Sequence, residues 1–124
     1  MIGFIINILK LTRAIVLGVR NDQEFRILLF LLISLLIGST FFFSQAEGWS
    51  AIDSLYFSVM TMSTVGYGDL VPTTTHSKLF TIIFTFLSIG VFVSLITKIV
   101  AVTLDQNKKT VEKIKAKSRK SSKN

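Results

Sequence analysis

The residues whose types and spacing could do chemistry lie in the stretch Thr64 to Asp69, TVGYGD, where one tyrosine separates two glycines. Glycine adopts positive φ at little cost, so successive carbonyl oxygens can point the same way here, whereas a regular strand alternates them. The oxygens that would stack along one axis are those of Thr64, Val65, Gly66 and Tyr67. Cations coordinated by these oxygens would then take the place of the missing hydrogen-bond donors. Because one chain offers only one oxygen per level, the loop predicts an oligomer.

The composition excludes most other site chemistry. Half of the 124 residues are hydrophobic, eleven are phenylalanine, and there is no cysteine, which rules out disulfides, thiolate catalysis and cysteine-bound zinc. The single histidine, His76, cannot form a metal cluster by itself. No nucleophile, base and orienting group fall in a recognisable arrangement, so we do not expect an enzyme or a cofactor. The chain has fourteen basic and seven acidic residues. Beside long apolar runs, this excess of basic residues is more typical of membrane topology than of nucleic-acid binding.

Two uncharged stretches are long enough to cross a hydrocarbon core of about 30 Å. They predict an outer transmembrane helix at 27–46 and an inner one at 79–104, where Lys98 can snorkel toward headgroups. Between them, 51–63 is too short to cross and predicts a re-entrant helix. Ser50 followed by Asp53 resembles a capping box at its start. The sequence therefore predicts an all-α membrane protein.

Charge asymmetry predicts the topology. Basic residues precede the first span and follow the second, which favours cytoplasmic placement of both termini. Residues 1–20 place their basic side chains within one arc of a helical projection and predict an interfacial amphipathic helix. The lysine-rich segment 105–124 has few apolar positions and predicts a disordered tail, which could contact anionic lipid headgroups.

The stretch from Thr61 to Asp69 resembles the signature sequence of potassium channels, in which four such loops form a selectivity filter. Together with the two spans, it makes residues 27–104 similar to the two-transmembrane pore-domain family, most of all to small bacterial tetrameric cation channels, some of which conduct sodium as well. The resemblance implies a homotetramer in the cell membrane, with a selectivity filter at 64–69 that binds K⁺ at Thr64, Val65, Gly66 and Tyr67. It further implies that Thr64 adds its hydroxyl, that Val65 and Tyr67 pack the filter against its helices, and that Gly68, Asp69 and the Tyr56 hydroxyl support it.

The same resemblance implies that the inner helix lines the inner part of the pore. Four residues at near-helical spacing are candidates for a hydrophobic constriction: Ile89, Phe92, Ile96 and Val100. Lipid-facing or interhelical packing is the alternative, because almost every position there is apolar. Counting from the filter puts Ser88 where many relatives carry a glycine hinge, and Gly90 could substitute for it.

These observations predict a potassium-selective pore that conducts dehydrated K⁺ passively. The alternative within the same architecture is a poorly selective Na⁺/K⁺ channel; a membrane adaptor would leave the filter motif unexplained. Sodium-conducting relatives replace the filter tyrosine and final aspartate, whereas Tyr67 and Asp69 are present here, which favours potassium. Additional regulatory domains or subunits stay open as partners.

Overall fold

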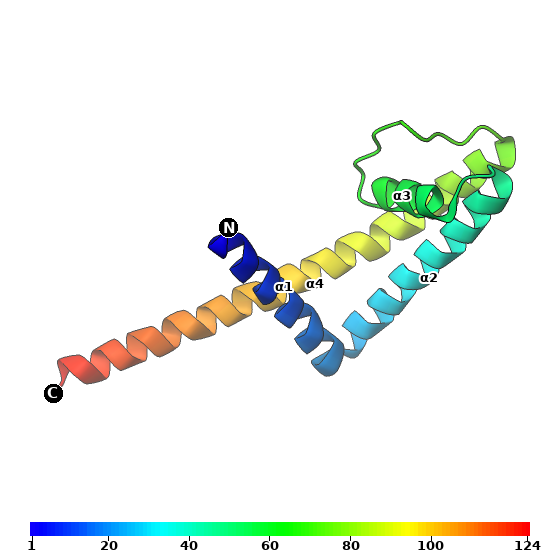
Figure 1. Cartoon of the computed structure of the whole chain (residues 1–124). Coiled ribbons are helices and arrows are strands. Elements are labelled where there is room, and N and C mark those ends of the chain that lie inside the picture. Colours follow the sequence, from blue (N-terminus) through cyan, green and yellow to red (C-terminus); the bar gives the residue numbers. More distant parts are fainter. The chain divides into compact units, whose positions relative to one another are not determined.

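The computed structural model describes residues 1–124, and it is helical with no strand. The chain forms α1 (Ile2–Asn21), α2 (Gln23–Ala46), α3 (Ala51–Met62) and α4 (Thr75–Ser122) (Figure 1). The all-helical prediction is confirmed. Contacts divide the chain into two compact units: residues 26–95 form one, and residues 1–25 together with 96–124 form the other.

The unit of residues 26–95 is held together by an aromatic cluster centred on Phe43. This side chain is fully buried at the end of α2. Its ring centroid lies 4.8 Å from that of Phe57 in α3, 5.5 Å from that of Phe80 in α4 and 5.6 Å from that of Trp49 in the α2–α3 connection. Aromatic pairs at these separations add to the free energy of area burial. The cluster therefore fixes the start of α3, and with it the loop that follows.

Helix α3 begins as the sequence predicts. The Ser50 side chain caps it by accepting a hydrogen bond from the Asp53 amide at 3.0 Å. The helix ends at Met62, one residue earlier than predicted, and the Ser63 hydroxyl donates to the Val59 carbonyl at 2.7 Å. Twelve residues rise only about 18 Å, so α3 is too short to cross a bilayer.

Three helices are long and apolar enough to span a membrane: α1, α2 and α4. The two predicted spans are among them, with α2 starting four residues before the predicted outer helix and α4 starting four residues before the predicted inner one. Helix α1 meets the same criterion of length and composition. The interfacial placement of residues 1–20 therefore stays a prediction.

The prediction of a disordered tail at 105–124 is wrong, because α4 continues without a break to Ser122. The segment contains no glycine or proline and is rich in lysine, a good helix former. Asp105 and Lys109 also form an ion pair one turn apart at 3.3 Å. The charge of this segment is compatible with an exposed helix.

Candidate functional site

The loop after α3 reverses its backbone handedness at every second residue. Positive φ values occur at Thr64 (63°), Gly66 (50°) and Gly68 (77°), while the residues between them keep negative φ. Such alternation turns neighbouring amide groups to one side of the chain and leaves the carbonyls on the other. The two glycines adopt the conformation that the sequence predicts. Thr64 was missed: positive φ is an outlier for a β-branched residue, of a kind that costs about 1–3 kcal/mol.

The amide groups of the loop are tied to the last turn of α3. Thr64 N donates to the Thr61 carbonyl at 3.1 Å, and the amides of Val65 and Gly66 both donate to the Met60 carbonyl, at 3.0 and 3.1 Å. None of the four carbonyl oxygens of residues 64–67 accepts a hydrogen bond, and all four residues are exposed. These oxygens are free to bind a ligand, and α3 holds the backbone that carries them.

The side chains of the loop lack cover in one chain. Tyr67 is 73% exposed and Val65 is 50% exposed. The predicted packing of these two residues against the helices around the filter therefore stays a prediction. Any cover for the Tyr67 ring has to come from another molecule.

The structure brings Tyr56 and Asp69 together, as the sequence predicts. Both line a cavity of about 260 Å³ behind the loop, together with Met60 and Tyr67. Within this cavity the Asp69 carboxylate lies near the Tyr56 hydroxyl. This contact connects the end of the loop to α3.

A second support, at Glu47, could not be found in the sequence. Its carboxylate accepts hydrogen bonds from the Thr73 amide (2.8 Å), the Thr73 hydroxyl (2.7 Å) and the Thr74 amide (3.3 Å). The Thr73 hydroxyl and amide lower the pKa of Glu47 from 4.5 to about 2. Glu47 therefore clamps the segment that runs from the loop into α4. No local pattern links Glu47 with Thr73, because they lie 26 residues apart.

This clamp predicts a defined pH dependence. Because the folded pKa is lower than the unfolded one, the contribution of Glu47 to stability is complete above about pH 4.5 and is lost as pH falls toward 2. We expect Glu47→Gln to lower the thermal midpoint in detergent at neutral pH, and the difference from wild type to shrink between pH 4.5 and 2. A difference that stays constant across this window would show that the carboxylate charge is not what Thr73 recognises.

The residues of the inner helix that are predicted candidates for the pore lining or gate fall into two groups by exposure: Ser88 is buried, and the other five are at least partly exposed. Ser88 is completely buried, and its hydroxyl donates to the Thr85 carbonyl at 3.3 Å. Its role at the position of the glycine hinge stays a prediction. Ile96 and Val100 are 43% and 50% exposed, and Ile89 and Phe92 are partly exposed. Gly90 is exposed, with no atom within 4 Å of a Cβ built on it. These five positions stay candidates for the pore lining or gate.

A comparison with known protein families decides what kind of site this is. Residues 29–105, more than half of the chain, match the family described as "Ion channel". The chain belongs to this ion channel family. The channel is therefore a membrane protein and not an enzyme, and the matched region contains α3, the loop, most of α2, and α4 as far as residue 105.

The channel is similar to named relatives over this region. Two pore potassium channel b of Oryza sativa is 40% identical over 82 residues, 60% of this chain and 24% of the relative. Two-pore potassium channel 1 of Arabidopsis thaliana is 40% identical over 72 residues, 53% of this chain and 20% of the relative. The channel thus spans about a quarter or less of these curated relatives.

A solved structure is also similar, with a TM-score of 0.61 and 32% sequence identity. It belongs to a calcium-activated cation channel from Tsukamurella paurometabola, and the match covers 69% of this chain and 84% of the other. The similarity supports the pore-domain fold.

In the unit of residues 1–25 and 96–124, Lys98 holds the turn between α1 and α2. Its ammonium lies 3.0 Å from the Asp22 carboxylate and 2.7 Å from that of Glu24. The hydrogen bond from Lys98 lowers the pKa of Asp22. The other Asp22 oxygen accepts from the Glu24 amide at 3.0 Å, so one residue fixes both the turn and the lysine. The sequence predicts that the Lys98 side chain extends toward the lipid headgroups, whereas in the structure its ammonium binds these two carboxylates.

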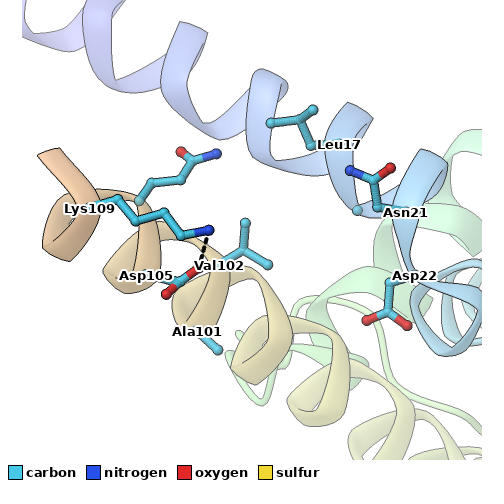
Figure 2. Close-up of a pocket in the computed structure, with 9 residues that line it drawn as sticks. Leu17, Asn21, Asp22, Ala101, Val102, Asp105 and Lys109 are labelled. Carbon is cyan, nitrogen blue, oxygen red and sulfur yellow. Dashed lines mark ion pairs between the residues drawn. The ribbon is translucent and has the colours of Figure 1, made fainter.

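Beside this network lies a pocket of about 490 Å³ between α1 and α4 (Figure 2). Leu17 and Asn21 line it from α1, and Val102 lines it from α4. The ion pair of Asp105 and Lys109 lies on the α4 wall, as the dashed line in Figure 2 shows. Nowhere in residues 1–124 do three or more His, Cys, Asp or Glu side chains form a group that could hold a metal ion.

Proposed function

We propose that the channel is a potassium-selective homotetrameric pore that conducts dehydrated K⁺ passively down its electrochemical gradient. The observation that carries the proposal is the alternating backbone of residues 64–68, with its amides bound to α3 and its carbonyls unbonded. Four chains around one axis would form rings of oxygens at Thr64, Val65, Gly66 and Tyr67. Such rings replace the hydration shell of the ion.

Two features that a single chain lacks support the tetramer: a full ring of oxygens at each level of the filter, and cover for the Tyr67 side chain. A single loop provides one oxygen per level, and its Tyr67 ring is largely uncovered. Burying an aromatic side chain is strongly favourable, so neighbouring copies that cover Tyr67 would stabilise the assembly and the filter together. In this assembly Thr64 also offers its hydroxyl, and Gly68 and Asp69 support the outer end of the filter.

Potassium selectivity is supported by the residues of the loop and by the names of the curated relatives, which are potassium channels. The alternative is a poorly selective Na⁺/K⁺ pore. The name of the similar solved structure, a cation channel, favours this alternative as much as the first. Tyr67 and Asp69, which sodium-conducting relatives replace, favour potassium.

The proposed location is the plasma membrane, with both termini in the cytoplasm. Basic residues flank the apolar helices at these ends, in agreement with the charge rule for cytoplasmic segments. Lys109, just beyond the apolar part of α4, would contact anionic lipid headgroups.

A flux assay on purified protein in liposomes tests selectivity. With potassium inside and either rubidium or sodium outside, we expect rubidium uptake and exclusion of sodium. Protein carrying Gly66→Asp, which places a carboxylate in the filter, is the control and should show no uptake. Equal uptake of sodium would overturn the proposal of selectivity and leave the poorly selective pore. Uptake that persists in Gly66→Asp would show that the ions take another path.

A further inference from the structure

The last part of α4 carries a shallow groove along one face. The groove measures about 410 Å³ and is lined by Leu104, Asn107, Lys108, Val111, Glu112 and Lys115. Leu104 is 57% exposed, Val111 49%, and Ile114, further along the same face, 63%. An otherwise charged helix thus presents an uncovered apolar stripe to its surroundings.

The spacing of the stripe is that of a helix that pairs with another helix. Leu104, Asn107, Val111 and Ile114 alternate three and four residues apart, which are the a and d positions of a heptad. Lysines hold three of the four flanking e and g positions, Lys108, Lys115 and Lys117, and Thr110 holds the other. Residues at e and g set partner choice, and like charges there oppose pairing. A second copy of this helix is therefore a poor partner, and an acidic helix is a good one.

A membrane surface fits the stripe less well. At 1.5 Å per residue, Lys115 lies about 16 Å along the helix axis from Leu104, the last residue of the apolar run. This exceeds the screening length of about 8 Å at physiological ionic strength. Only the first lysines of the tail come within reach of headgroups. Nucleic acid fits poorly too, since the segment after Leu104 has one arginine and no aromatic side chain for base stacking.

We propose that the face of α4 formed by Leu104, Val111 and Ile114, with Lys108 and Lys115 beside it, docks an acidic amphipathic helix of another protein. The partner helix places leucine or valine against the stripe and glutamate against the lysines. Charge complementarity supplies specificity and speeds association, and burial of the three apolar side chains supplies affinity.

Binding of a designed peptide tests this. The probe is a fluorescent three-heptad peptide with leucine at a and d and glutamate at e and g, added to the full chain in nanodiscs of neutral phosphatidylcholine. We expect saturable binding by fluorescence anisotropy. The double variant Lys108→Glu/Lys115→Glu should weaken binding by about tenfold or more. Val111→Asn/Ile114→Asn should weaken it similarly, with α-helical circular dichroism as the check that the tail stays folded.

The matched control is Lys113→Glu/Lys120→Glu, which makes the same change of charge at positions outside the stripe and its flanks. We expect it to retain most of the binding. Equal loss in both lysine pairs would show unspecific attraction and overturn the docking face. Absence of binding in neutral nanodiscs would overturn it too, as would abolition of binding by anionic lipid in the nanodiscs, because the lysines would then belong to the membrane.

Discussion

Gly66→Ala is expected to abolish rubidium uptake into liposomes, with a loss of about tenfold or more. Gly66 has a φ of 50°, which a side chain makes unfavourable by about 1–3 kcal/mol. A Cβ at this position meets no atom within 4 Å in the chain, so crowding within the chain does not explain the loss. Relief of the strain would rotate the peptide group and turn a carbonyl oxygen away from the axis.

Gly38→Ala is the control for this experiment. Gly38 lies within α2, and a Cβ there also meets no atom within 4 Å, but its φ is negative. Alanine inside a helix is favoured over glycine by about 1 kcal/mol, so uptake should persist and stability should not fall. Wild-type uptake by Gly66→Ala would show that the alternating backbone is not needed for conduction.

The second large effect is expected at Lys98. Replacement by methionine leaves the carboxylates of Asp22 and Glu24 close together without their shared cation. The Lys98 side chain is only 25% exposed and that of Asp22 42%, so water replaces the lysine incompletely at Asp22; Glu24, at 79% exposed, contributes less to the effect. We expect Lys98→Met to lower the thermal midpoint of the purified channel by several degrees and to speed proteolysis at the turn between α1 and α2.

Lys109→Met is the matched control, because it breaks the ion pair with Asp105, whose two side chains are 71% and 64% exposed. Exposed pairs of this kind contribute little, so the midpoint should hardly change. Neutralising all three groups, as Lys98→Met/Asp22→Asn/Glu24→Gln, should recover much of the loss, since no charge is then left unpaired. Similar effects of the two single lysine variants would contradict a special role for Lys98.

The sequence was most informative where the chemistry of single residues restricts the backbone. The glycines of the TVGYG stretch predict their own positive φ values, and Ser50 with Asp53 predicts the start of α3. Both signals are local. The positive φ of Thr64 carries no such signal, because it arises from the hydrogen bonds that tie its neighbours to α3.

The misses have physical reasons as well. Glu47 and Thr73 meet only because the aromatic cluster brings the end of α2 near the start of α4. The burial of Ser88 could not be predicted, because the inner helix is apolar nearly all round and its sequence shows no periodicity from which to select a pore face. The tail was predicted to be disordered from its charge, although nothing in residues 105–122 breaks a helix.

Helix α4 has a mechanical property that follows from its composition. It runs for 48 residues with a single glycine, Gly90, and no proline. The helix is about 48 Å long from Gly90 to Ser122, and it resists bending least at Gly90. A small change in the bend at Gly90 would therefore displace the end of the helix at Ser122 by a large distance. The helix thus has the form of a lever: a weak lateral pull near Ser122 would exert a large torque at Gly90.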